Sequence, residues 1–539
     1  MIGRMMDSRT SKSARVANAE VAGAIGARAT TRKRVLVVNC YFPELRQPVK
    51  LTHEVPNALV PVMLAGAFSQ RFCDVRIHNE VSHGFLEVFR PQLLEWPDVV
   101  VLTGLTDTFD RMLHITAYVR SANPRVIVIA GGYPVRSFPR YAQKFFDYAC
   151  LGDIEELRDV IAEALGEDHV DHDMIPRYDL ADWIGKRIAY VESSRNCNFR
   201  CSFCTLTGEG HAYTKQSLEY LRRQIVGLGR REILLFVDNQ FHGGDRQFFL
   251  DRLALLRELR TQGYFRFWSG FATDAFFWND EDVALARESG CFSLLVGVES
   301  FDDTWLHRVN KAQNNRYPQV QLIERSLDAG ILFQYGLVFD PTERSVADMR
   351  RELEFVLDTP EVPLPNFIFN AIPFPGTPFF HDRHAKGLLL PGVKARDLEG
   401  STLTMRPIDG IDAVANFLRT DKNLASYRRR AMTHQSRLLW RYRRSLIPEQ
   451  LLASTICMTS ILSPKLVSNP RYAMLRKQPR THVGPTDRLD CVYTPRRRVD
   501  AAFESYFRPT LITDAGGQLN PALADDLLDA RYEPALVMA

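Results

Sequence analysis

The sequence predicts an α/β protein with three parts: an N-terminal doubly wound domain, a partial (βα)6 barrel and a mainly helical C-terminal region. Two stretches of alternating apolar and amphipathic segments predict the first two parts, because strands buried on both faces are short, continuous apolar runs. The third part follows from the loss of strand-like segments beyond about residue 400. A chain of 539 residues, 45% hydrophobic and 24% charged, is too long for one core and has the composition of globular domains.

The composition also bears on the cellular location of the protein. No apolar run approaches the ~20 residues that cross a bilayer, so no membrane span is predicted. Nine mostly dispersed cysteines favour a reducing compartment, and we expect a cytoplasmic location. Residues 1–33 are rich in Ala, Arg and Ser and poor in acids. They are expected to form a disordered leader, with a transit peptide as the alternative.

Residues 34–168 form the predicted doubly wound domain. Strands are expected at 34–40, 73–80, 98–105, 125–132 and 148–152, and helices at 54–70, 108–122 and 153–165. Acids, Pro and Gly then interrupt the alternation and predict a linker at 169–186. This pattern is typical of a parallel sheet covered by helices on both faces.

Residues 187–395 repeat the alternation six times and form the predicted barrel. Strands are expected at 187–194, 232–239, 265–274, 292–300, 331–340 and 366–374, with helices between them, for example at 217–229 and 246–262. In barrels of this kind the functional residues lie at the carboxyl ends of the strands. The loops that follow these six strands are therefore where a site is expected.

Residues 396–539 are expected to be mainly helical. The segment 424–446 is basic and carries aromatic residues at helical spacing. We expect a surface helix that covers the barrel. A cap that faces the substrate and a site for an acidic partner are the alternatives.

Three cysteines, Cys197, Cys201 and Cys204, follow the first barrel strand with the spacing Cys-x3-Cys-x2-Cys. A structural zinc site closes with four ligands, and the nearby His211 is poorly spaced for the fourth. Thiolates are natural ligands of a four-iron cluster. Three of them leave the fourth iron open to a small chelating molecule, and the short loop lets all three sulfurs reach one cluster.

This loop, with Phe203 at the aromatic position before the last cysteine, resembles that of the radical S-adenosylmethionine (radical SAM) superfamily. The resemblance implies a [4Fe-4S] cluster on the three cysteines and SAM on the open iron. SAM is then cleaved to a 5'-deoxyadenosyl radical, which abstracts hydrogen from the substrate. The resemblance also implies an electron donor of the flavodoxin or ferredoxin type.

Two further segments resemble SAM-contacting parts of this superfamily. The stretch "VGVESFDDTWLHRVNK" (296–311) resembles the fourth-strand motif and makes Glu299 and Ser300 candidate SAM contacts. The stretch "YGLVFD" (335–340) resembles the fifth-strand segment near the adenine and makes Gly336 a candidate.

Two other segments bear on the same resemblance. The stretch "FVDNQF" (236–241) stands where a Gly-Gly-Glu-type segment meets the SAM amine. It departs from that pattern, and Asp238 and Asn239 are the candidates it offers. The stretch "IPFPGTPFF" (372–380) resembles a Pro-Gly-Thr-Pro motif that is common in members with an N-terminal cobalamin-binding domain.

The doubly wound domain in turn resembles cobalamin-binding domains, in which the corrin lies over the strand ends and its nucleotide tail threads between sheet and helix. Of their fingerprint, the segments "TGL" and "GG" match the Ser-x-Leu and Gly-Gly parts. The candidates for cobalamin contact are Thr103, Leu105, Gly131 and Gly132. Two ordinary tight turns are the alternative. The Asp-x-His-x-x-Gly part is missing after the first strand, and its match at 382–387 stands in the wrong context.

Together the resemblances imply a cobalamin-dependent enzyme similar to the class B radical SAM methyltransferases. It would methylate an unactivated carbon of a small-molecule or lipid substrate through methylcobalamin and a 5'-deoxyadenosyl radical. A cyclisation or rearrangement enzyme of the same architecture, and a front domain that binds no cobalamin, are the alternatives. A structural or redox cluster in a nucleic-acid-binding protein is disfavoured by the open iron and the net charge of only +4, so no nucleic-acid partner is expected.

Overall fold

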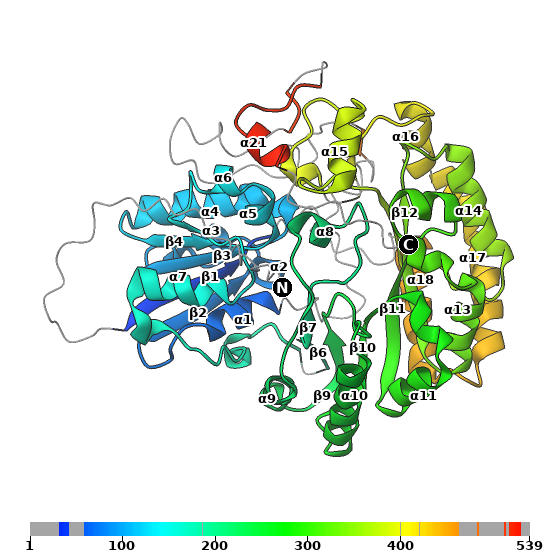
Figure 1. Cartoon of the computed structure of the whole chain (residues 1–539), viewed down its shortest axis with the longest axis horizontal. Coiled ribbons are helices and arrows are strands. Elements are labelled where there is room, and N and C mark those ends of the chain that lie inside the picture. Colours follow the sequence, from blue (N-terminus) through cyan, green and yellow to red (C-terminus); the bar gives the residue numbers. More distant parts are fainter. Residues whose placement is uncertain are drawn as a thin grey trace, which may run out of the picture.

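A computed structural model describes residues 32–41, 59–185, 187–398, 400, 402–419, 421–462, 482–483, 511–513 and 517–529. Two parallel sheets lie side by side, each flanked by helices, and the C-terminal helices pack outside the second sheet (Figure 1). The predicted α/β class and the order of its parts are confirmed. The predicted leader lies outside the described residues except for its last two positions.

The front sheet has five parallel strands in the order β2-β1-β3-β4-β5. Its strands are β1 (Lys33–Asn39), β2 (Cys73–Asn79), β3 (Val99–Thr103), β4 (Ile127–Ala130) and β5 (Tyr148–Ala149). The chain moves outward in one direction from β1 to β2 and in the other from β3 onward. The loops after β1 and β3 therefore diverge, and doubly wound sheets bind ligands in the crevice that this reversal leaves.

Both faces of the front sheet are buried. Successive side chains of a strand point to opposite faces, so Val35 and Val37 join one apolar cluster while Leu36 and Val38 join the other. The helices α1 (Val60–Gly66) and α7 (Glu156–Leu165) cover the first face, and α4 (Phe109–Ala122) covers the second. Short helices lie between them: α2 (Glu80–His83), α3 (Leu86–Phe89), α5 (Tyr133–Ser137) and α6 (Pro139–Ala142).

The second sheet has six parallel strands in the order β13-β12-β11-β10-β9-β6. Its strands are β6 (Ile188–Val191), β9 (Arg231–Phe236), β10 (Phe265–Ala272), β11 (Cys291–Glu299), β12 (Leu332–Phe339) and β13 (Phe367–Asn370). Each strand pairs with the next one along the chain, and the edge strands β6 and β13 do not pair with each other. The sheet is thus the open, partial barrel that the sequence predicts.

Amphipathic helices connect the barrel strands. They are α9 (Leu218–Leu228), α10 (Arg246–Thr261), α11 (Asp280–Glu288), α12 (Asp303–Arg308), α13 (Gln319–Asp328) and α14 (Val346–Asp358), and α15 (Pro378–Ala385) follows the last strand. In α10 the Asp245 carboxylate accepts a hydrogen bond from the Phe248 N–H (2.9 Å) and starts the helix. Phe249, Leu253 and Leu256 are then buried, because this spacing places them on one face.

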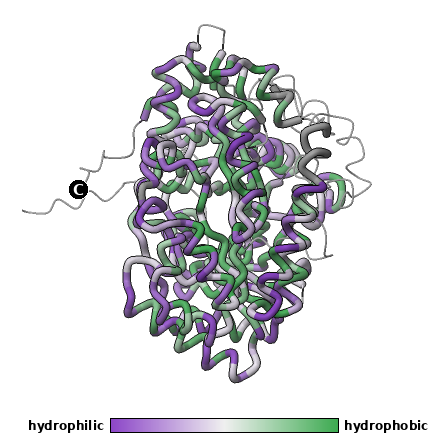
Figure 2. The backbone as a smooth tube through the Cα atoms, turned by 90° about the vertical axis from the view of Figure 1, so that its right-hand side faces the viewer, coloured by the Kyte–Doolittle hydropathy of each residue, from purple (hydrophilic) through white to green (hydrophobic). Residues whose placement is uncertain are grey.

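The C-terminal helices are α16 (Ile411–Arg419), α17 (Asp421–Tyr442) and α18 (Pro448–Leu462). The basic helix α17 buries Ala431, His434, Leu438 and Tyr442 on one face. Arg430 forms an ion pair with Asp358 of α14 (2.7 Å), and Arg441 forms one with Glu324 of α13 (2.9 Å). This helix therefore lies against the outside of the barrel helices. Hydrophilic and hydrophobic segments alternate along the helices on this side of the molecule (Figure 2).

The last described segment, residues 517–529 with helix α21 (Ala524–Leu527), returns to the front domain (red in Figure 1). The buried Asp526 carboxylate accepts hydrogen bonds from the backbone N–H groups of Arg140 (3.0 Å) and Tyr141 (2.9 Å). These donors belong to the first turn of α6, where helical N–H groups have no partner within the helix. The segment therefore caps the N-terminus of α6.

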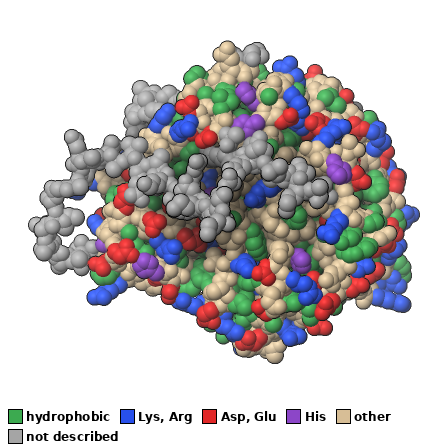
Figure 3. Space-filling model, viewed as in Figure 1, with side chains coloured by type: hydrophobic (Ala, Val, Ile, Leu, Met, Phe, Trp, Pro, Cys, Tyr) green, Lys and Arg blue, Asp and Glu red, His purple; other side chains and the backbone are tan. Residues whose placement is uncertain are grey.

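Among the residues described here, no helix combines the length and the apolar character needed to cross a bilayer. On the face shown in Figure 3, basic and acidic side chains are interspersed. Such a mixture produces no extended field of one sign on this face, in line with the net charge of +4.

Candidate functional site

The three cysteines lie in a loop at the carboxyl end of β6. A two-stranded ribbon, β7 (Ser194–Arg195) with β8 (Thr214–Lys215), brackets this loop, and α8 (Thr205–Glu209) begins directly after Cys204. Asn196 has a φ of 62°, a left-handed conformation that Asn tolerates better than most residues, and it turns the chain into the loop. The loop thus stands at the strand ends, where the barrel is expected to carry its site.

Asp238 supports the chain just before the loop. Its carboxylate, fully buried after β9, accepts hydrogen bonds from the Ser193 N–H (2.8 Å) and the Ser194 hydroxyl (2.5 Å). It also pairs with the buried guanidinium of Arg252 (3.0 Å). These contacts use both carboxylate oxygens within the protein. They favour a positioning role for Asp238 and do not support the predicted contact with SAM.

The thiols of the loop interact with one another. Burial, followed by the neighbouring Cys201, raises the pKa of the Cys204 thiol to about 12, and burial also raises the pKa of Cys197. The side-chain amide of Gln313 donates to the Cys201 sulfur (3.3 Å). Without metal the Cys197 and Cys204 thiols are therefore protonated near neutral pH, and iron must displace their protons to bind.

Within the described residues, no three His, Cys, Asp or Glu side chains converge on a single metal ion. This arrangement gives no support to a zinc site with His211. It is compatible with a cluster, because each thiolate of a cubane binds a different iron. The donor set, three soft sulfurs on one short loop, fits iron–sulfur chemistry.

Glu299 and Lys311 form a buried ion pair beside the loop. The Lys311 ammonium lies 2.8 Å from the Glu299 carboxylate and 5.9 Å from the Phe203 ring centroid. Burial alone would lower the pKa of Lys311, but the charge of the Glu299 carboxylate raises it. Gly297 leaves room for the pair, since a Cβ there would lie only 2.8 Å from the Lys311 nitrogen.

The backbone at Glu299 explains how this carboxylate reaches the site. Its φ of 60° is uncommon for a residue with a side chain, and the pairing of β11 with β12 shifts register just before it. The bulge aims the carboxylate toward Lys311. The sequence predicted Glu299 as a SAM contact, and its position beside the loop is compatible with that prediction.

Ser300 and Gly336 have a different setting. The buried Ser300 hydroxyl donates to Glu352 (2.6 Å) and accepts from Arg344 (3.2 Å), so it faces α14. A Cβ at Gly336 would lie 2.0 Å from the Phe367 ring, which packs over this position. Both residues therefore serve packing within the barrel, and their predicted contacts with SAM gain no support.

Sequence reasoning did not single out Asp274, a buried carboxylate after β10. One of its oxygens accepts from the Ala275 N–H (2.8 Å) and the other has no hydrogen-bond partner. Burial raises the pKa of Asp274 to about 7. Its place at a strand end was the available signal, and the same holds for Lys311, which closes the quoted 296–311 segment.

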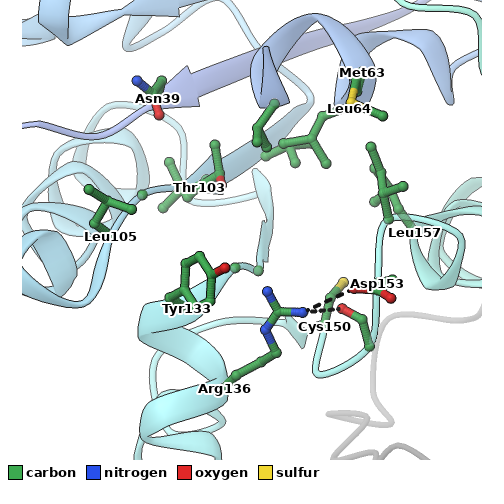
Figure 4. Close-up of a pocket in the computed structure, with 18 of the residues that line it drawn as sticks. Asn39, Met63, Leu64, Thr103, Leu105, Tyr133, Arg136, Cys150, Asp153 and Leu157 are labelled. Carbon is green, nitrogen blue, oxygen red and sulfur yellow. Dashed lines mark hydrogen bonds and ion pairs between the residues drawn. The ribbon is translucent and has the colours of Figure 1, made fainter. Parts of the chain in front are cut away.

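A cavity of about 610 Å³ lies at the carboxyl ends of the front strands, facing the barrel (Figure 4). Its lining falls into two zones. The apolar zone lies between the sheet and helices α1 and α7 and includes Met63, Leu64, Val101, Ile129 and Leu157. The polar zone lies at the domain junction and includes Tyr133, Arg136, Asp153, Arg195 and Glu209.

The four candidate cobalamin contacts all line this cavity, at the ends of β3 and β4. Gly132 has a φ of 88°, and a Cβ on Gly131 would lie 3.3 Å from the Cys150 Cβ. Thr103 is buried and Leu105 is exposed. Small residues at the mouth and an apolar space between sheet and helices fit the corrin and tail of cobalamin.

Asn239 joins the cavity from the barrel side. It is exposed, follows the buried Asp238 and lines the same space as Asn196 and Glu192. Burial raises the pKa of Glu192 to about 7, opposed by Arg195, which donates to it (2.5 Å). The same guanidinium donates to Glu155 of the front domain (2.6 Å), so both domains build the polar zone.

Comparison with known proteins supports both domains. The sequence model of the radical SAM superfamily matches residues 191–353, and that of the B12 binding domain matches residues 52–162. The matches confirm the predicted cofactors: a [4Fe-4S] cluster and SAM for the first domain, and cobalamin for the second.

Two curated relatives match parts of the chain. The uncharacterized methyltransferase sll1242 of Synechocystis sp. is 25% identical over 349 residues, 60% of this chain and 62% of the relative. The hopanoid C-2 methylase of Rhodopseudomonas palustris is 24% identical over 301 residues, 52% of this chain and 55% of the relative. The matches thus span less than two thirds of either relative.

The fold is similar to that of a solved structure. The cobalamin-dependent S-adenosylmethionine radical enzyme OxsB, with aqua-cobalamin and S-adenosylmethionine bound, superposes with a TM-score of 0.55. The superposition covers 80% of this chain and 75% of that one, at 14% identity. At this identity the likeness concerns the fold alone.

Proposed function

We propose that this chain, whose residues 191–353 match the radical SAM superfamily and whose residues 52–162 match the B12 binding domain, methylates carbon. The proposed substrate is an unactivated carbon of a small molecule or a lipid. The observation that carries the proposal is the cavity at the front sheet, which is lined on its barrel side by Leu206 and Glu209 of α8, the helix that follows Cys204. The predicted cobalamin site therefore adjoins the segment that follows the cluster ligand Cys204.

In this proposal Cys197, Cys201 and Cys204 hold the cluster. Lys311 is a buried cation beside the loop and is suited to the carboxylate at the methionine end of SAM. Glu299 then orients Lys311 and accepts from SAM in turn. Phe203 stacks on Trp305 at a centroid distance of 6.1 Å, which fixes the ring beside the last cysteine.

The cavity would hold cobalamin, which supplies a transferable methyl group when bound. Thr103, Leu105, Gly131 and Gly132 would contact the corrin and its tail, and Asn239 would contact it from the barrel. No histidine lines the cavity among the described residues. Cobalt would thus be held through corrin contacts, with both domains excluding water from the junction.

The compartment and the reductant complete the proposal. Cys40, Cys73, Cys150 and Cys291 are free and buried, which fits a reducing setting such as the cytoplasm. Reduction of the cluster would come from a donor of the flavodoxin or ferredoxin type.

The decisive experiment is anaerobic purification with hydroxocobalamin supplied, followed by iron and cobalt quantification and ultraviolet–visible spectroscopy. We expect about four irons, from the cubane, and one cobalt per chain, and release of 5'-deoxyadenosine from SAM after reduction. Four irons without cobalt would overturn methyl transfer through cobalamin and leave a radical SAM enzyme of another reaction type. Absence of iron would overturn the proposal as a whole.

A further inference from the structure

Arg136 occupies the boundary between the two predicted cofactor sites. It lies on α5, at the end of β4, and its guanidinium points into the cavity between Tyr133 and Cys150 (Figure 4). Its side chain is only 13% exposed, and the guanidinium lies 5.1 Å from the Tyr133 ring centroid. Any corrin in this cavity would therefore lie within reach of Arg136.

The partners of Arg136 come from both domains. Within the front domain, one nitrogen (Nη1) donates to the Asp153 carboxylate (3.3 Å) and to the Gly152 carbonyl (3.4 Å). Across the junction, Nε lies 3.1 Å from a carboxylate oxygen of Glu209. Charge-assisted contacts between groups this buried are stronger than those on an open surface.

Glu209 is the last residue of α8, and Cys204 stands directly before the first residue of that helix. Another side of α8 is packed tightly, since a Cβ at Gly208 would lie 2.9 Å from the Gly376 carbonyl oxygen. Helix α8 thus lies between the backbone at Gly376 and the Arg136 side chain. A stronger or weaker ion pair between Arg136 and Glu209 therefore affects the position of α8 and of Cys204, the cluster ligand directly before it.

We propose that Arg136 is a positioning residue that couples occupancy of the cobalamin cavity to the cluster loop, and hence to SAM binding. A corrin in the cavity would exclude water from the Arg136–Glu209 pair, and an ion pair strengthens as its surroundings lose water. The strengthened pair holds α8 and Cys204 in place. Coupling of this kind is reciprocal: cobalamin tightens SAM, and SAM tightens cobalamin.

This inference rests on the proposed function, because it needs both cofactors. Its test uses the full chain with a reconstituted cluster and measures the SAM dissociation constant by calorimetry, with and without saturating hydroxocobalamin. For the wild type we expect SAM to bind at least about fivefold more tightly with cobalamin, the lower end of usual coupling. The electron paramagnetic resonance spectrum of the reduced cluster should also change when cobalamin is added.

Two variants each remove one partner of the Arg136–Glu209 ion pair. In Arg136→Gln and in Glu209→Gln we expect the ratio of the two SAM constants to fall to about one, with four irons retained. If Arg136→Gln no longer retains cobalamin, Glu209→Gln carries the test. The matched control is Arg120→Gln, which cuts an exposed pair with Asp147 on the same domain (3.0 Å) and should keep the wild-type ratio.

The outcomes separate the inference from its premise. A wild type that binds iron and cobalt but shows equal SAM constants overturns the coupling and leaves the proposed function standing. A Glu209→Gln variant with the wild-type ratio and the wild-type spectral change also overturns it. A wild type that binds no cobalamin overturns the proposed function, and the coupling with it.

Discussion

The cysteine loop and the cobalamin cavity are built in opposite ways. The loop gathers its three cluster ligands from eight consecutive residues, 197–204, after one strand. The cavity gathers its lining from the ends of β1, β3, β4 and β5, from helices α1 and α7, and from three parts of the barrel. A contiguous site is visible in the sequence as a spacing, whereas a dispersed site is visible only through the small residues that leave space for it.

The largest expected effect is the loss of iron when the cysteine loop is changed. Replacing Cys201 by Ala should reduce iron from about four per chain to near zero and abolish 5'-deoxyadenosine formation, because the cluster then lacks one of its three thiolate ligands. Iron analysis and chromatography of the SAM products measure this. The matched variant Cys291→Ala removes a fully buried thiol of β11 and should keep the iron. Retained SAM cleavage in Cys201→Ala would contradict the assignment of the loop.

Asp238 and Asn239 sharpen the comparison, because they are adjacent and serve different sites. Asp238→Asn should destabilise the protein by about 3–5 kcal/mol, since it leaves the buried charge of Arg252 unpaired. Denaturant unfolding of the two variants measures the difference. Asn239→Ala, at an exposed position, should change stability by less than about 0.5 kcal/mol. Equal stability losses would mean that the setting of Asp238 is misjudged.

The cavity can be tested without touching the loop. Gly131→Leu should weaken cobalamin binding about tenfold or more, roughly 1.4 kcal/mol, because the new side chain occupies the mouth of the cavity. Cobalt per chain after gel filtration reports the loss, and iron should stay unchanged. Gly227→Ala, in α9 where nothing lies within 4 Å of a new Cβ, is the control. Undiminished cobalt would show that the tail does not pass this point.

The smallest effect concerns pH. The pKa of Asp274 is raised to about 7 in the folded protein, above its usual value of 3.8, chiefly by burial. Between these values the folded state binds more protons than the unfolded state, so this group makes stability fall as pH rises toward about 7. Asp274→Asn should flatten that slope, as measured by urea unfolding between about pH 5 and 8. A slope equal to that of the wild type would show that Asp274 is ionised throughout.

Much of the fold followed from sequence because apolar runs and helical periodicity are local signals. The six barrel strands and five front strands lie within a few residues of their expected ranges. The sites followed less fully. Ser300 and Glu299 are adjacent, yet Ser300 bonds to α14 while Glu299 pairs with Lys311 beside the loop. No local pattern encodes the register shift before Glu299 or its left-handed backbone.

Gly336 and Arg136 are two further residues whose surroundings could not be predicted from the sequence. The space beside Gly336 is filled by Phe367, a residue on the neighbouring strand β13. The role of Arg136 depends on Glu209, which belongs to the other domain. Such relations are set by register and domain packing, and a single sequence carries no signal of either.

The return of the C-terminal segment to α6 has a consequence for synthesis of the chain. Asp526 is made 386 residues after the amide group that it caps at Arg140. At a translation rate of about 5–20 residues per second, α6 waits roughly 20–80 s for this partner. The front domain therefore leaves the ribosome with one helix end uncapped, and its final surface forms only after the rest of the chain has been translated.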